Sequence, residues 1–261
     1  MNIRRGISGS TLKIIAVITM LIDHVGAGIL GRCIIEAGIA QAFYDEQWAA
    51  QNADLLSANG ALLTAYWVFR MIGRIAFPIY CFLLVEGLTY TSNVKRYAVR
   101  LALFSLISEV PFDMAFSGTV LEFEYQNVFF TLLIGLLVMW AYRTVEERET
   151  WKPVVKAVLD IAAVAAGMAA ADFLRTDYGA IGIVCIMALY IFRKNKKHQI
   201  LAGCIGFSWE ITAPIAFFPI AFYNGKRGFH IKYFFYAFYP LHLLIIWLAA
   251  TVLGMGRLPA L

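Results

Sequence analysis

Two histidines stand within apolar stretches of this sequence, where an imidazole has few polar neighbours. His24 lies in the run 11–31 and His242 in the run 233–254. At 1.5 Å per helical residue, His24 lies about 20 Å and His242 about 14 Å from the start of its run. Both therefore fall at middle depth in a helix that crosses a bilayer. Two imidazoles at one depth predict a general base with a positioning group, although each could also be a structural histidine.

Asp23 precedes His24, but successive side chains on a helix diverge by about 100°, so Asp23 need not orient His24. Arg70 and Arg74 are four residues apart and share a helix face. Either arginine could pair with Asp23 and neutralise it. Alternatively, the two arginines could bind a phosphate or a developing negative charge, since guanidinium groups suit forked contacts. Spacing alone leaves both roles open.

Further polar residues interrupt the apolar runs. Glu86 and Glu109 could act as an acid or a base, or as hydrogen-bond partners between helices, and Asn127 is a neutral member of the set. A charged side chain at the bilayer centre costs at least ~2.5 kcal/mol, so each one needs a partner or a function. The set exceeds what a passive membrane anchor requires.

The common catalytic and metal-binding motifs are missing. The sequence has no GxSxG, P-loop, GxGxxG or HExxH pattern and no metal-like Cys/His spacing. The four cysteines form no CxxC pair, and we interpret them as buried small apolar residues. No metal site is predicted.

The amino-acid composition indicates which class of protein must position these residues. The chain has 261 residues, of which 61% are hydrophobic and 15% charged, and its mean hydropathy is +0.71. Soluble domains contain roughly 45–50% apolar and about 25% charged residues. This excludes a soluble enzyme, a disordered chain and a secreted disulfide-rich scaffold. The net charge of +5 follows the loops and does not indicate a nucleic-acid partner.

The apolar runs predict an all-α, polytopic membrane protein. A helix needs about 20 apolar residues to cross the hydrocarbon core. We expect eight to ten transmembrane helices in a single domain over residues 1–261. The candidate spans are 11–31, 64–91, 98–116, 127–143, 154–172, 178–193, 199–222 and 233–254. Pro78 is expected to kink the second span, because proline lacks the N–H of a helical hydrogen bond.

Loop charges predict the orientation in the membrane. Residues 1–13 and 92–100 carry Arg and Lys without acids, and residues 193–197 are Arg-Lys-Asn-Lys-Lys. Loops 32–60 and 117–126 are mainly acidic. By the positive-inside rule, the N-terminus is expected to be cytoplasmic.

One stretch does not fit this alternation. If 199–222 is a single span, the basic residues Lys226 and Arg227 fall outside the cell. The stretch contains Pro214 and Pro219, which favour a broken helix or a re-entrant hairpin. Such a hairpin would return the basic loop to the inside.

Across most of its length the sequence resembles the TraX family, proteins associated with acetylation of conjugative F-type pilin. The most specific blocks are the Asp-His-x-Gly of residues 23–26 and the Phe-Tyr-Pro-Leu-His-Leu of residues 238–243. The other blocks are residues 12–16, 70–80, 85–87, 97–101, 127–132 and 176–179.

The resemblance implies a relation to acyltransferase-3-type membrane enzymes, which take acetyl groups from cytoplasmic acetyl-CoA. It implies that His24 is catalytic, with Asp23 in support and His242 in the same cavity. The residues expected to bind substrate or donor are Arg70, Arg74, Glu86, Asn127, Tyr178 and Tyr239.

These expectations combine into one hypothesis. The chain would be a multi-pass acetyltransferase in the cytoplasmic membrane of a bacterium, taking acetyl groups from acetyl-CoA. The acceptor is an amine or hydroxyl on a pilin N-terminus or another envelope molecule. Five basic residues are expected to contact the nucleotide phosphates of acetyl-CoA, namely Lys95, Arg96, Arg193, Lys194 and Lys197. His24 could act as a base or carry the acetyl group itself.

Two other classes of function compete with this hypothesis. A proton-coupled transporter also uses Asp, Glu, His and Arg within the membrane. No paired repeats or matching broken helices appear in the two halves, which disfavours it. A scaffold of a secretion apparatus is the third class, and it has little need for buried charges.

Overall fold

A computed structural model describes residues 6–229, 232–256 and 258 of the chain. Arg4 and Arg5, which contribute to the predicted orientation, lie outside these residues. The described part of the chain is helical, with no strand element. The all-α expectation is therefore confirmed.

The first apolar segment is one rod made of three helical pieces. Helix α1 (Gly9–Val25) begins at Ser8, whose hydroxyl accepts the Thr11 N–H at 3.2 Å. A π-helical turn η1 (Gly26–Leu30) follows directly after His24, and α2 (Gly31–Glu36) completes the rod. π-Turns inside α-helices occur frequently at functional sites, and this one follows the residue expected to be catalytic.

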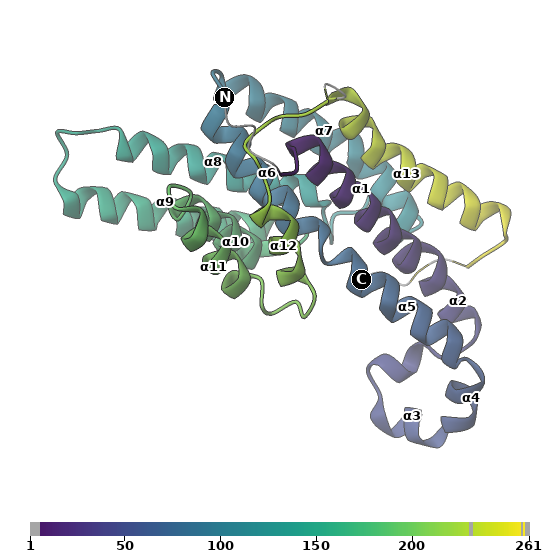
Figure 1. Ribbon diagram of the computed structural model, residues 1–261. Helices are drawn as coiled ribbons and strands as arrows, with labels where there is room; N and C mark the ends of the chain where they lie inside the picture. The colour runs from purple at the N-terminus through teal and green to yellow at the C-terminus, as the bar shows by residue number, and fades with distance from the viewer. Residues whose placement is uncertain (1–5, 230–231, 257, 259–261) are drawn as a thin grey trace.

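Loop 37–59 projects beyond the helical bundle (Figure 1). It contains three short helices, η2 (Ala40–Phe43), α3 (Glu46–Gln51) and α4 (Ala53–Ala58). Asp45 starts α3 by accepting the Trp48 N–H at 2.9 Å.

The predicted span 64–91 is two helices in the structure. Helix α5 (Gly60–Gly73) ends at Gly73 with Arg74 as its C-cap, and α6 (Ala76–Tyr90) begins two residues after Arg74. Pro78 lies in the first turn of α6 and cannot donate a main-chain hydrogen bond to the Arg74 carbonyl. The interruption therefore comes one turn before the proline.

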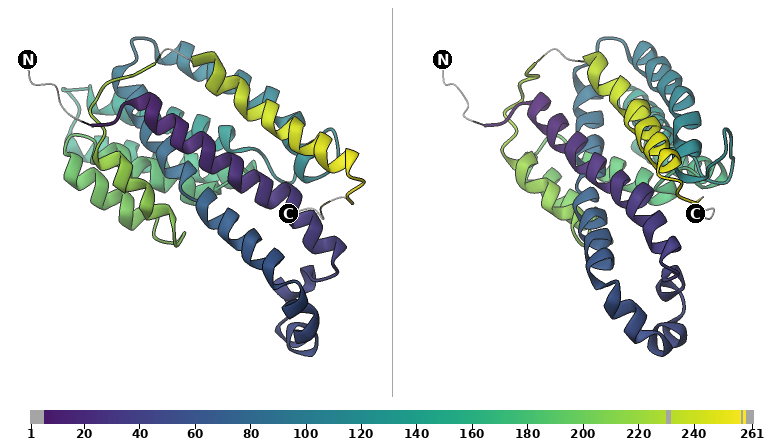
Figure 2. Two further views of the ribbon diagram at one scale, coloured as in Figure 1. Left: turned by 45° about the vertical axis from the view of Figure 1, so that its right-hand side comes forward. Right: turned by 90° about the vertical axis from the view of Figure 1, so that its right-hand side faces the viewer.

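The remaining long helices follow the expected runs. They are α7 (Val94–Phe116), α8 (Val128–Glu146), α9 (Pro153–Phe173), the shorter α10 (Gly179–Ile191) and α13 (Lys232–Val252). Helix α1 packs between α5 and α13, and α13 also packs along α7 (Figures 1 and 2). Helices α8 and α9 form an antiparallel hairpin beside α10.

The stretch 199–222 is broken. It comprises most of α11 (Lys196–Gly206), a 3₁₀ turn η3 (Ala213–Ala216) and α12 (Phe217–Ala221). The Lys196 ammonium donates to the Tyr223 carbonyl at 2.7 Å, so the stretch starts and ends at the same end of the molecule. This is the returning hairpin that the loop charges favoured, and it brings the basic loop back to the end where α1 begins.

Within the described residues, five helical segments are long and apolar enough to cross a membrane. They are Gly9–Glu36, Gly60–Tyr90, Val128–Glu146, Pro153–Phe173 and Phe234–Val252. The chain is therefore a membrane protein, whereas the predicted count of eight to ten spans is not confirmed. The 178–193 candidate contains α10, which has only 13 residues.

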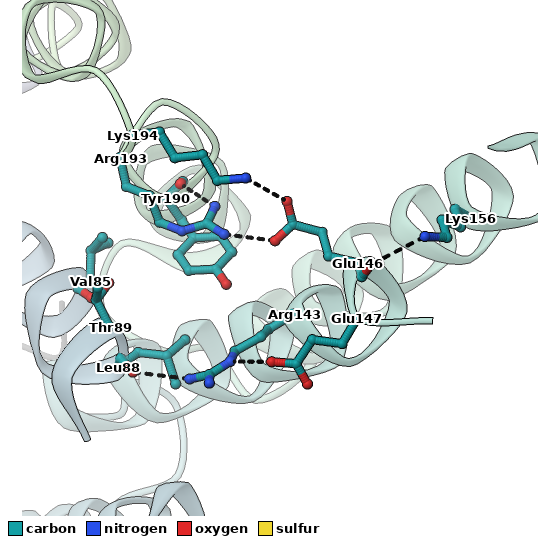
Figure 3. A network of polar contacts seen from close by, with 10 residues as sticks. All are labelled: Val85, Leu88, Thr89, Arg143, Glu146, Glu147, Lys156, Tyr190, Arg193 and Lys194. Carbon is teal, nitrogen blue, oxygen red and sulfur yellow. Dashed lines mark hydrogen bonds and ion pairs between the residues drawn. The ribbon is translucent and has the colours of Figure 1, made fainter. Parts of the chain in front are cut away.

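The two ends of the bundle differ in charge. The end that we call the basic end carries residues 6–13, 90–97, 146–153, 193–197 and 222–229. Figure 3 shows part of it, where Arg193 donates to Glu146 at 2.6 Å and Arg143 reaches the Leu88 carbonyl at 3.4 Å. These bonds join α10, α8 and α6. The opposite end, which we call the acidic end, carries the loops 37–59, 117–127 and 174–178.

Candidate functional site

The two histidines meet inside the bundle. His24 Nδ1 lies 2.6 Å from His242 Nε2, and the imidazole planes are within 3° of parallel. His242 is 4% exposed. The matched depth predicted from sequence thus becomes a direct hydrogen bond between α1 and α13.

The hydrogen bonds fix the tautomer of each neutral ring. His242 Nδ1 lies 2.8 Å from the Phe238 carbonyl, which can only accept, so Nδ1 carries the hydrogen. His242 Nε2 is then the acceptor, and His24 Nδ1 must donate to it. The hydrogen of His24 is therefore on Nδ1, and its Nε2 has a free lone pair. Among the described residues, none bonds this nitrogen.

Small residues let the helices approach closely at the pair. A Cβ built on Gly28 would lie 2.6 Å from Ile246 of α13, and one on Gly26 would lie 2.8 Å from Phe69 of α5. Both glycines belong to the π-turn that follows His24. The turn and its glycines therefore set how α1 contacts both neighbouring helices.

Asp23 diverges from His24 by about 100° around α1, lines the same cavity and bonds an arginine. Arg70 donates to Asp23 Oδ2 at 2.8 Å, one of the two pairings that spacing allowed. The second oxygen, Oδ1, is buried without a protein partner among the described residues. Gly73 of α5 permits this approach, because a Cβ there would lie 2.2 Å from the Asp23 side chain.

Arg74 has a different partner. It pairs with Glu210 at 3.1 Å, in the segment between α11 and η3. Close by, the Thr212 hydroxyl donates to the Met71 carbonyl at 2.6 Å. The broken stretch is thereby fastened to the end of α5.

His24 lines a cavity of about 280 Å³, which we call the smaller cavity, whereas His242 and Glu210 do not line it. It opens toward the acidic end, since Ala40, Phe43 and Tyr44 of loop 37–59 line its mouth. Five residues predicted from sequence line it, namely Asp23, His24, Arg70, Arg74 and Tyr178. His24 therefore has access from this end of the bundle.

Tyr125 and Asp177 complete the smaller cavity, and the sequence analysis did not single them out. The Tyr125 hydroxyl donates to Asp177 Oδ1 at 2.5 Å. Asp177 lies in the turn between α9 and α10. Burial raises the pKa of its carboxyl to about 6, although the Tyr125 hydrogen bond favours the charged form. In the sequence, the Thr-Asp-Tyr-Gly run of residues 176–179 was the one feature that pointed to this part of the site. It forms a turn with positive φ at Tyr178 and Gly179.

A second cavity, of about 520 Å³, opens at the basic end, and we call it the larger cavity. The basic residues in its wall are Lys13, Arg100 and Arg227. Its deep end is formed by Met20, Tyr80, Val128, Phe129 and Tyr239.

Tyr239 connects the larger cavity with the histidine pair. The side chain lines the larger cavity, is 3% exposed and lies against both imidazoles, with centroid distances of 5.8 Å to His24 and 5.6 Å to His242. Phe129 packs on its other side, 4.9 Å between centroids. An aromatic layer one side chain thick thus lies between the larger cavity and His24.

Two predicted site residues lie away from the histidine pair. Glu86 lines the larger cavity near its mouth, beside Tyr223. Asn127 lines neither cavity and is fully buried, where it caps α8 by accepting the Phe129 N–H at 3.0 Å and donates to Glu109. Asn127 is therefore the N-cap of α8 in this structure.

The basic residues expected to meet phosphates are also elsewhere. Arg193 and Lys194 pair with Glu146, and the guanidinium of Arg193 lies 3.8 Å from the Tyr190 ring. Lys95, Arg96 and Lys197 do not line the larger cavity either. Sequence reasoning grouped them by loop charge, which does not report the direction of a side chain.

Arg32 was counted as a loop residue but is buried, at 3% exposure. It donates to the Gly28 carbonyl within the π-turn, to the Ala115 carbonyl at the end of α7 (2.8 Å) and to the Gly256 carbonyl (3.0 Å). Its charge therefore satisfies main-chain carbonyls just beyond the histidine pair.

The chain is similar to known proteins over most of its length. The family model described as TraX protein matches residues 8–250. The probable fimbrial assembly protein FimC, serogroup H1, of Dichelobacter nodosus is 25% identical over 269 residues, which cover 92% of this chain and 94% of that protein. No solved structure matches the chain.

Proposed function

The chain belongs to the TraX family of membrane proteins, and on this premise we propose that it transfers an acetyl group from acetyl-CoA to an acceptor on a pilin or fimbrial subunit. The observation that carries the proposal is the hydrogen bond from His24 Nδ1–H to His242, which leaves His24 Nε2 free as a base. The relative named as a fimbrial assembly protein supports the acceptor class.

The proposed orientation places the basic end in the cytoplasm, together with the N-terminus. Acetyl-CoA then enters the larger cavity from inside, with its phosphates near Lys13, Arg100 and Arg227. The narrow pantetheine arm extends toward Tyr239. The acceptor approaches through the smaller cavity from the opposite side.

The proposed chemistry is direct acyl transfer. The acceptor nitrogen or oxygen attacks the thioester carbonyl carbon as His24 Nε2 removes its proton, forming the new C–N or C–O bond. The tetrahedral intermediate collapses with cleavage of the C–S bond. His24 returns the proton to the departing sulfur, and free CoA thiol is released. His242 stabilises the transient imidazolium by accepting the Nδ1 hydrogen bond.

The cavity walls support an amine acceptor in particular. Asp23 Oδ1 is buried and unpartnered, and Asp177 adds a second carboxyl group to the same cavity. Arg70 and Arg74 line the same cavity and offset the carboxyl charges, so an ammonium group would bind locally, at the unpartnered Asp23 Oδ1, before it loses its proton. We infer that the pair Arg70–Asp23 helps to position the acceptor, on the opposite side of His24 from the donor.

The test uses the purified full chain in lipid nanodiscs with radiolabelled acetyl-CoA. The acceptor probes are a short apolar peptide with a free amino terminus, the same peptide with a blocked terminus, and N-acetylglucosamine as a hydroxyl probe. We expect CoA release and labelling of the free amine, lost by a factor on the order of 100 or more in His24→Ala.

His198→Ala is the matched control, since His198 lies at the start of α11 beside Phe192 and lines neither cavity. It should retain wild-type turnover. The proposal fails if wild-type protein neither binds nor consumes acetyl-CoA, or if His24→Ala is as active as His198→Ala.

A proton-coupled transporter is the second candidate. The observation in its favour is that cavities reach the bundle centre from both ends and are separated by one aromatic layer. Proton-driven flux in proteoliposomes that is abolished by Asp23→Asn, without any acetyl-CoA turnover, would favour it.

A further inference from the structure

The deep end of the larger cavity contains two tyrosines that the mechanism above does not use. Tyr80 of α6 and Tyr239 of α13 both line it. Among the described residues, no hydrogen bond joins either hydroxyl to another side chain. Two phenol donors at the end of a buried cavity would be left unsatisfied by a purely apolar ligand.

The N-terminus of α8 lies beside one of these donors. Val128 and Phe129, the first two residues of α8, line the larger cavity together with Tyr239, and the Phe129 ring packs on the Tyr239 ring at 4.9 Å between centroids. Asn127 accepts the Phe129 N–H with its side chain and the Phe130 N–H with its carbonyl. The positive end of the 19-residue helix α8 therefore lies at the deep end of the cavity, where it would favour a developing negative charge.

We propose that Tyr239, beside the α8 N-terminus and assisted by Tyr80, donates to the thioester carbonyl oxygen of the donor and stabilises the oxyanion that forms there. The inference rests on the proposed function and names the residues of that site that carry the developing charge. Tyr239 suits this role because it touches the larger cavity on one side and the His24 ring on the other.

Tyr239→Phe is the test, since it keeps the ring contacts with His24, His242 and Phe129 and removes only the hydroxyl. Losing one oxyanion donor should lower kcat on the order of 100-fold while the KM for acetyl-CoA stays unchanged. Tyr80→Phe should have a smaller effect of the same kind. Tyr142→Phe is the control, because Tyr142 of α8 is also partly buried but packs on Tyr190 and lines neither cavity.

A spectroscopic readout separates this role from a structural one. The carbonyl stretch of bound acetyl-CoA, labelled with ¹³C at the carbonyl, should lie at a lower frequency in wild type than in Tyr239→Phe. Unchanged kcat together with an unshifted band in Tyr239→Phe would overturn the inference and leave the acetyltransferase proposal intact. Wild-type protein that is inactive with acetyl-CoA would overturn both.

Discussion

At the scale of single residues, the nitrogen that His24 leaves free to accept a proton depends on a hydrogen bond that its other nitrogen donates. A neutral imidazole presents one lone pair, and the hydrogen bond made by the other nitrogen decides which. Here the Phe238 carbonyl sets the state of His242, and His242 sets that of His24. The Phe238 main-chain carbonyl on α13, two hydrogen bonds away, thus determines which nitrogen of His24 has the free lone pair.

Replacing His242 tests this chain of bonds. His242→Ala leaves His24 Nδ1 without an acceptor, so the free lone pair is no longer confined to Nε2 and kcat should fall on the order of 100-fold. His242→Gln supplies an amide oxygen that can accept from Nδ1 and should restore part of the loss. Turnover assays and acetyl-CoA binding should be measured together. Wild-type turnover in His242→Ala would contradict the role.

Asp177 gives a prediction about stability and pH. Its pKa is raised to about 6 in the folded chain, against 3.8 when it is exposed to water. The fold therefore binds the proton more tightly, and this contribution is complete below pH 4 and lost as the pH rises through 6. At pH 7 the buried charge costs roughly 2 kcal/mol, allowing for partial exposure.

Asp177→Asn should therefore unfold at a higher temperature than wild type at pH 7, whereas the two should coincide near pH 4. The asparagine oxygen still accepts from Tyr125, so the local contact is retained. Thermal unfolding in detergent at both pH values measures the difference. A gap of equal size at pH 4 and pH 7 would show that Asp177 does not titrate with folding.

At the scale of helices, the site depends on how closely α1 approaches α5. Gly73→Ala would place a methyl group 2.2 Å from the Asp23 side chain, so the helices must separate. Overpacking of this kind costs typically 1–3 kcal/mol. We expect a lower unfolding temperature and a loss of activity, because the Asp23–Arg70 pair is displaced.

Gly60→Ala is the matched control on the same helix. A Cβ at Gly60 meets nothing within 4 Å, and alanine favours helix more than glycine does. Its stability should be equal to wild type or slightly higher. If both variants lose stability equally, the close approach at Gly73 is not the cause.

The sequence predicted these helices better than it predicted their contacts. Apolar runs located the long helices because a segment in lipid must satisfy its own hydrogen bonds. Pro78 was expected to interrupt the second span, and the break lies one turn before it. The burial of Arg32 was missed, since it depends on which carbonyls neighbouring helices leave unpaired. Likewise, His24 and His242 were matched in depth, but only packing could show that their nitrogens meet.

At the scale of the whole molecule, the two cavities give the protein two chemically different faces. The larger cavity has Lys13, Arg100 and Arg227 in its wall with Glu86 near its mouth, whereas the smaller one has Asp23 and Asp177 together with Arg70 and Arg74. His24 with Tyr239 lies where the two cavities approach each other. In the proposed reaction, the donor and the acceptor would therefore enter from different ends of the bundle. This separation holds only if the two faces lie on opposite sides of the membrane.

Cysteine labelling tests that arrangement directly. Tyr44, at the acidic end, is 80% exposed, and Tyr90, at the basic end, is 73% exposed. In a background with Cys33, Cys81, Cys185 and Cys204 replaced by alanine, the Tyr44→Cys variant should react with a membrane-impermeant maleimide on intact spheroplasts. The Tyr90→Cys variant should react only after the membrane is opened. The loop charges predict this outcome, because loops rich in lysine and arginine are retained on the cytoplasmic side.

The reverse labelling pattern would place the larger cavity outside the cell, where no cytoplasmic thioester could enter it. Labelling of both variants from outside would exclude a bundle that spans the membrane between these two residues.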